Sequence, residues 1–214
     1  MIYKSMNDAA YSIIRMKLLG GEFELGGRIR EDILAKEISM SRTPIREAIN
    51  RLVSEGIIVK KSQQGLYLID PLPEQIEDHI EIRISLEKLS IKKCIERSTD
   101  EDIDAICNSL KEFEEALDRK DFEECNKLDS KFHSMIAQFS NNTPLIRLLN
   151  QFSDFFKLVR IKEKKRDPEM KNKGTLKEHR RIMEAIKKRD VLAAQNAVEE
   201  NIRSMRKNLF NKTT

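Results

Sequence analysis

The chain has 214 residues, with 40 Lys and Arg against 36 Asp and Glu, and this net charge of +4 is too small to indicate nucleic-acid binding by itself. Charged residues make up 36% of it, aromatic residues only 6%, and there is no tryptophan, which is typical of soluble, mainly helical proteins. No apolar run of about 18 residues occurs, and the N-terminal stretch lacks a signal peptide's apolar core. Three cysteines without CxxC spacing argue against a disulfide framework. We therefore expect a cytoplasmic, mainly α protein with reduced thiols.

The first 71 residues contain signals for three short helices and a hairpin. Gly20 and Gly21 end the first apolar periodic run, and Gly56 ends the third. Two β-prone runs then flank polar residues that end in Gly65. The predicted elements are helices over 9–19, 31–38 and 41 to about 55, and strands over 57–59 and 66–69. The order of helix, tight turn, helix and hairpin predicts a winged helix-turn-helix.

Regular structure is interrupted at Pro71 and Pro73, and no strand-like alternation follows. This predicts two domains, over 1–71 and 72–214, the second an all-α antiparallel bundle of about six helices. A charged stretch with Pro168 and Gly174 predicts the one long loop, after residue 164. The predicted helices of the second domain span 74–97, 100–118, 121–140, 144–164, 175–188 and 190–209.

The segment SRTPIREAINR, residues 41–51, separates into two faces when each residue turns by about 100°. The apolar face holds Ile45, Ala48, Ile49 and Leu52, and the opposite face holds Thr43, Arg46, Glu47 and Asn50. Arginine can hold guanine O6 and N7, and helix N-terminal N–H groups can bind phosphates, so the outer face is suited to DNA. Spacing alone equally allows Arg42, Arg46 and Arg51 to be solvated charges that pair with nearby glutamates. Arg51 points sideways, which favours a structural or phosphate-contacting role.

The run LAKEISMSRTPIREAINRLVSEGIIV, within residues 10–69, resembles the DNA-binding domain of the GntR family of bacterial transcription regulators. The resemblance implies that Arg42, Thr43 and Arg46 contact operator bases or phosphates, and that Gly65 lets the wing approach the minor groove. Ser41, Asn50 and Gln64 complete the expected DNA-binding set. Asp32 is a departure, because some relatives carry a DNA-contacting arginine there.

A second constellation lies in the helical domain. Asp129 and His133 are four residues apart and so share a helix face, and His179 begins another apolar helix. A carboxylate and two imidazoles suit a transition metal, but buried histidines are also common as ordinary core residues. The spacing leaves both interpretations open.

Residues 77–206 resemble the FCD ligand domain of the FadR-type subgroup, through EIRISLEKL, LDSKFHSMIAQFSNN, PLIRLLNQF, KEHRRIMEAIKKRD and AVEENIRSM. In metal-binding members an aspartate and three histidines form the site, and Asp129, His133 and His179 match the first three. Asn201 stands in the fourth position, where its carbonyl oxygen is a poorer ligand for zinc or nickel than imidazole. The alternatives are a weakened zinc, nickel or manganese site, another metal, or a metal-free pocket, and we expect the first.

On the first helix of this domain, Arg83 is a candidate cation for a carboxylate effector. It is also placed to pair with Glu87 one turn later, and we favour the pairing.

Together these features predict a non-enzymatic transcriptional regulator, a repressor that binds a palindromic operator as a homodimer and responds to a carboxylate metabolite. The alternative is a metal-dependent hydrolase in which Asp129, His133 and His179 activate water, with the first domain as a localisation module. No well-placed general base accompanies that triad, which disfavours it. A nucleoid-type structural binder would need no pocket at all.

Overall fold

The computed structural model describes residues 5–61, 65–161 and 167–210, with side chains as far as Met205. It separates into two compact units, residues 1–72 with 154–162, and residues 73–153 with 163–214.

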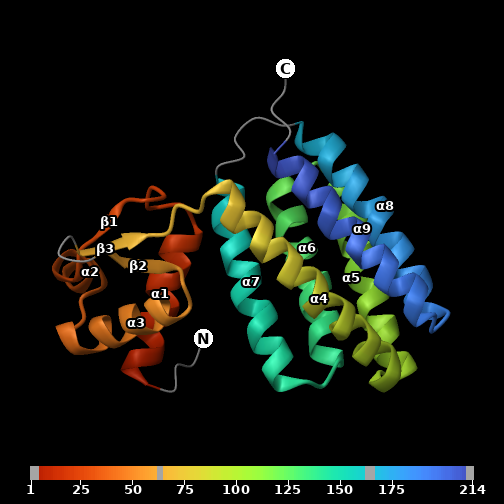
Figure 1. Ribbon diagram of the computed structural model, residues 1–214, viewed down its shortest axis with the longest axis horizontal. Coiled ribbons are helices and arrows are strands. Elements are labelled where there is room, and N and C mark those ends of the chain that lie inside the picture. Colours follow the sequence, from red (N-terminus) through yellow and green to blue (C-terminus); the bar gives the residue numbers. More distant parts are fainter. Residues whose placement is uncertain (1–4, 62–64, 162–166, 211–214) are drawn as a thin grey trace. The chain divides into compact units, whose positions relative to one another are not determined.

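Within its described part, the first unit contains three complete helices, a small sheet and residues 154–161, which end a further helix (Figure 1). The elements are α1 (Met6–Leu19), β1 (Arg28–Ile29), α2 (Glu31–Ile38), α3 (Arg42–Ser54), β2 (Ile58–Lys61) and β3 (Gly65–Leu68). The sheet is antiparallel in the order β1-β3-β2. The predicted helix-turn-helix and hairpin are confirmed. The two-residue strand β1 was not predicted, because it is too short to show a period-two pattern.

The turn between α2 and α3 is tight because Ser39 adopts a left-handed conformation with φ 55°. The Ser39 N–H donates to the Lys36 carbonyl and the Met40 N–H to the Ala35 carbonyl, which satisfies the end of α2. The core beneath the two helices is formed by Ile14, Leu18, Leu34, Ile45, Ile49, Leu52 and Leu68. This apolar packing fixes which face of α3 is turned to solvent.

Within its described residues, the second unit consists of helices and the short connections between them (Figure 1). Its helices are α4 (Pro73–Arg97), α5 (Asp100–Asp118), α6 (Phe122–Phe139), α7 (Thr143–Ile161), α8 (Pro168–Lys187) and α9 (Val191–Phe210), with α7 divided between the two units. Thr99 and Asp102 form a capping box that starts α5, and the Asp121 side chain caps α6. Helix α4 packs against α6 and α9, and α5 packs against α6 and α8. Six helices were predicted, and the mainly α fold class is confirmed.

The prediction of a loop as far as Gly174 is wrong, because residues 168–174 are helical; residues 162–166 lie outside the described part of the chain. The Asp167 side chain accepts from the Glu169 and Met170 N–H groups, and Pro168 follows at the first helical position. The cap and the proline together start a helix one residue after Asp167. In the sequence Pro168 and Gly174 indicate a break, although proline is favourable at a helix start and one helical glycine costs only about 1 kcal/mol.

Among the described helices, none combines the length and the apolar character needed to cross a bilayer. Cys94, Cys107 and Cys125 are all described and form no disulfide.

Candidate functional site

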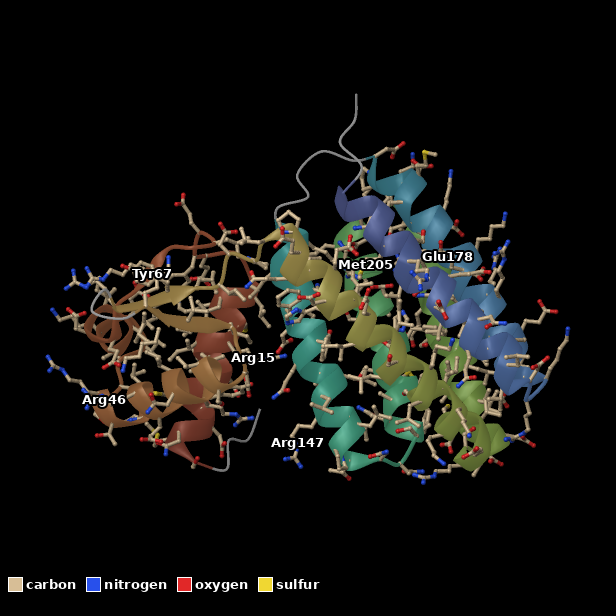
Figure 2. All side chains as sticks on the ribbon, viewed as in Figure 1. Arg15, Arg46, Tyr67, Arg147, Glu178 and Met205 are labelled. Carbon is tan, nitrogen blue, oxygen red and sulfur yellow. The ribbon has the colours of Figure 1, made fainter. Side chains whose placement is uncertain are left out.

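Helix α3 presents a polar face whose side chains are held outward by the buried face beneath. Ile45, Ala48 and Ile49 are at most 1% exposed. The expected DNA-binding residues Ser41, Arg42, Thr43, Arg46 and Asn50 are all exposed. Arg46 extends away from the ribbon of its unit (Figure 2). The structure thus brings five of the seven expected residues to one end and one side of a single helix.

The Arg46 guanidinium has a weak neighbour on α2. Its Nε lies 3.4 Å from Glu31 Oε2, and the arginine side chain is 63% exposed. A long, solvated ion pair of this kind contributes little free energy, so it leaves the guanidinium available to another anion.

Arg51 lies on the same helix but has a different environment. Its guanidinium carbon lies 3.7 Å from the centroid of the Tyr11 ring, and its Nε donates to Glu55 Oε1 over 3.2 Å. The Tyr11 hydroxyl in turn donates to the Glu55 carboxylate at 2.8 and 3.0 Å. Burial, and then the hydrogen bond and charge of Glu55, raise the pKa of Tyr11 to about 12. Arg51 therefore joins α3 to α1, which favours the structural role over base reading.

The wing strands carry basic residues beside Gly65, whose φ is +107°. Gly65 pairs with Lys61, and the space where its side chain would stand lies 3.5 Å from the Arg28 guanidinium. The Lys61 Nζ lies 4.6 Å from the Tyr67 ring centroid. Gln64, the remaining expected residue, lies outside the described residues.

Arg28 was missed by the sequence analysis. Only the pairing of the unforeseen strand β1 with β3, which sets Arg28 opposite Tyr67, brings it to the wing.

Asp32, where some relatives carry an arginine, is paired with Arg30. The Arg30 Nη2 lies 2.8 Å from Asp32 Oδ2, and this hydrogen bond holds the pKa of Asp32 below its ordinary value. An ionised Asp32 disfavours a phosphate at this point.

In the second unit, Asp129, His133 and His179 come together from α6 and α8. One ligand atom from each lies within 4.8 Å of the others. The His179 Nε2 lies 3.3 Å from Asp129 Oδ1, and the two imidazole ring centroids are 5.2 Å apart. His179 is fully buried, with Phe132 stacked on its ring at 4.3 Å. Two imidazoles and one carboxylate at this separation fit zinc, nickel or manganese and leave coordination positions open.

Helix α4 brings a buried ion pair to the same cluster. Arg83 and Glu87 are 8% and 3% exposed, and the Arg83 Nε and Nη2 both donate to Glu87 Oε1 over 3.2 Å. The same carboxylate oxygen lies 3.6 Å from His133 Nδ1. Burial alone would raise the pKa of Glu87, but the neighbouring charges of His133 and Arg83, together with the Arg83 hydrogen bonds, lower it. The expected pairing of Arg83 is present, and the neighbouring histidine was not foreseen.

Asn201, in the fourth expected position, lies on α9 and is 8% exposed. Its Nδ2 donates to Glu178 Oε2 over 2.8 Å, and Glu178 directly precedes His179. Since an amide nitrogen is only a donor, the carbonyl oxygen is the atom that Asn201 can offer to a cation.

The two units match two protein-family models. Residues 6–68 match the model for bacterial regulatory proteins of the gntR family, and residues 78–204 match the FCD domain. The HTH-type transcriptional regulator YdhC of Bacillus subtilis is 31% identical over 88% of this chain and 84% of its own. The gluconate operon transcriptional repressor of Bacillus licheniformis is 29% identical over 83% of this chain and 74% of its own.

Solved structures show the same fold. McbR/YncC of E. coli superposes with a TM-score of 0.85 over 98% of both chains, at 21% sequence identity. A GntR-type regulator from Rhodococcus sp. RHA1 reaches 0.79 at 18% identity, over 97% of this chain and 99% of its own. The chain belongs to the gntR family of bacterial regulatory proteins, with a DNA-binding helix-turn-helix unit followed by an FCD domain.

Proposed function

We propose that this protein is a cytoplasmic repressor that binds a palindromic operator as a homodimer and is controlled by a carboxylate metabolite in its FCD domain. The observation that carries the proposal is the exposed set of Arg42, Thr43 and Arg46 on an α3 anchored by its buried face. Relatives named as operon repressors, among them the gluconate operon repressor, support repression as the mode of action.

In this proposal each part of the DNA-binding unit has a distinct role. Arg42 and Arg46 read base edges or hold phosphates, while Ser41, Thr43 and the first N–H groups of α3 bind the backbone. Asn50, about one turn after Arg46, lies at the edge of this contact between α3 and DNA.

Gly65 and Gln64 bring the wing to the neighbouring groove, with Arg28 and Lys61 supplying positive charge beside it.

An apolar strip on the FCD domain supports a homodimer. Ile82 and Leu89 are 51% and 40% exposed on α4 and lie two helical turns apart, and Leu148 on α7 is 44% exposed. Leu86, between the two on α4, packs against a cluster that contains Leu145 on α7. Two recognition helices must match two half-sites of a palindrome, so a two-fold dimer through this strip is the natural assembly.

The cluster of Asp129, His133 and His179 is the proposed centre of the effector site. A divalent zinc, nickel or manganese ion held by these side chains, with Asn201 or water beside them, supplies a positive charge for a carboxylate. Arg83 belongs to this site indirectly, because its guanidinium donates hydrogen bonds to the Glu87 carboxylate. The effector regulates DNA binding only if it binds the dimer conformation that can bind DNA and the one that cannot with different affinities.

The test compares two arginines of the same helix. Fluorescence anisotropy measures binding to DNA from the protein's own promoter region for the wild type, Arg46→Ala and Arg51→Ala. We expect Arg46→Ala to weaken specific binding by roughly 10- to 100-fold, the loss of one good base contact, without changing the dimer. Arg51→Ala removes the same charge from the same helix and should retain most of the affinity.

Unchanged specific affinity in Arg46→Ala would remove Arg46 from the recognition set. Binding that is independent of sequence and disappears with modest salt would contradict an operator-specific repressor altogether. Native mass spectrometry of the purified protein, followed by release of DNA with the co-purified metabolite, tests the effector separately.

A further inference from the structure

We infer that Glu87 is a positioning residue of the metal centre: it holds His133 through Nδ1 and thereby directs the other ring nitrogen, Nε2, to the ion. The inference rests on the metal site of the proposed function and adds a residue from a third helix, α4, to the ligands from α6 and α8. Glu87 does not itself ligate the ion in this arrangement.

The geometry supports this role. Glu87 Oε1 lies 3.6 Å from His133 Nδ1, just beyond hydrogen-bond length, and the two side chains are 4% and 9% exposed. Within the described part of the chain, neither His133 Nδ1 nor Glu87 Oε2 has a hydrogen-bond partner, although both atoms are buried. A buried imidazole nitrogen and a buried carboxylate with unused hydrogen-bonding capacity are costly unless a small shift joins them.

Metal binding supplies the reason for that shift. When one imidazole nitrogen ligates a cation, the other carries the proton and must donate it to an acceptor. In this protein the Glu87 carboxylate is the acceptor next to Nδ1. It fixes the ring orientation and makes His133 a stronger donor to the ion.

Arg83 makes a buried carboxylate possible at this place. Its two hydrogen bonds to Oε1 offset the cost of burying a negative charge and fix the carboxylate on the helix. The carboxylate still has capacity to accept the imidazole proton, because Oε2 has no hydrogen-bond partner among the described residues and Oε1 lies 3.6 Å from Nδ1. By contrast, the group of close ligand atoms consists of Asp129, His133 and His179 without Glu87, which favours an outer position over direct ligation.

The experiment titrates chelator-treated full-length protein with Co²⁺ and records the visible spectrum, with a competing chelator to obtain the dissociation constant. The variants are Glu87→Gln, which keeps the shape and one acceptor oxygen, and Glu87→Leu, which removes the acceptor. Glu81→Gln, an exposed change of the same kind on the same helix, is the matched control. The thermal midpoint of each metal-free protein shows whether a variant is folded.

We expect Glu87→Leu to weaken Co²⁺ binding by about 10- to 100-fold and Glu87→Gln by less, both with an altered Co²⁺ spectrum, while Glu81→Gln matches the wild type. Should Glu87→Leu fail to fold, the isosteric Glu87→Gln decides. Wild-type affinity and spectrum in folded Glu87→Gln would overturn the positioning role and leave the metal site standing. Absence of stoichiometric Co²⁺ in the wild type would overturn the metal site and this inference together, while the Arg46 test of DNA binding would still stand.

Discussion

The two arginines at positions 46 and 51 differ in their surroundings more than in their chemistry. Arg46 projects from α3 with a single long contact to Glu31. Arg51 is fixed between an aromatic ring and a carboxylate, so its loss affects packing between helices as well as charge. The Arg51 guanidinium, held by these two contacts, is poorly placed to contact DNA in a groove.

Tyr11→Phe is predicted to lower the free energy of unfolding by about 1 kcal/mol, because it leaves the Glu55 carboxylate without the phenol that donates to it. Chemical denaturation measures the change. Operator affinity should stay at the wild-type value, since Tyr11 belongs to α1. A variant with full stability would show that the hydrogen bond is replaced by water.

The same tyrosine predicts a dependence on alkaline pH. Its pKa is raised from 10.0 to about 12 in the folded protein, so folding favours the neutral phenol. The contribution is complete below pH 10 and is lost as the pH rises towards 12. Unfolding midpoints across this range should fall more steeply for the wild type than for Tyr11→Phe, and parallel curves would contradict the assignment.

At the scale of elements, α8 shows how local signals can be read in two ways. Asp167 caps α8, Pro168 is its first residue, and Gly174 lies inside the helix. An added Cβ at Gly174 would meet no atom within 4 Å, so nothing in its surroundings requires a glycine.

Gly174→Ala is therefore predicted to stabilise the protein by roughly 0.5–1 kcal/mol, because alanine loses less backbone entropy in a helix. The measurement is the denaturant midpoint. A lower midpoint would mean that the helix is not formed here in solution.

Asp167→Ala is predicted to have the opposite effect, a loss of about 1 kcal/mol, since the cap accepts from two N–H groups at the start of α8. Hydrogen exchange of residues 168–174 should accelerate in this variant. Asp167→Asn, which keeps a capping oxygen, serves as the control.

At the scale of the whole molecule, the proposed function requires two copies acting together. The strip of Ile82, Leu89 and Leu148 is an apolar feature that a single chain leaves in water. Operator binding should therefore depend on residues in the FCD domain that never touch DNA.

The double variant Ile82→Glu/Leu89→Glu is predicted to be monomeric in sedimentation experiments and to bind the operator at least 10-fold more weakly, since one half-site then carries the whole affinity. Leu192→Glu, at a residue 68% exposed on α9, is the control for added charge. A double variant that remains dimeric would place the dimer contact on another face.

Much of the fold follows from local pattern. The apolar period of α3, the glycine stops and the caps of α5 and α6 act within a few residues, so the sequence predicts the corresponding helices and the outward set with Arg42 and Arg46. Strand β1 and the start of α8 escaped prediction. A strand of two residues is too short to show a period. A proline can mark either the start of a helix or a break, and only a capping hydrogen bond from the residue before it distinguishes the two.

The sequence by itself determined the residue types available to the site and, through helical phase and resemblance, the candidates Asp129, His133 and His179. Only the tertiary structure decided that these three converge within 4.8 Å, that Arg51 stacks on Tyr11, and that the Arg83–Glu87 pair meets His133. The physical reason is that helical periodicity specifies which face a side chain occupies. The packing of α4, α6 and α8 specifies which faces meet, and it arises from contacts between residues far apart in the chain.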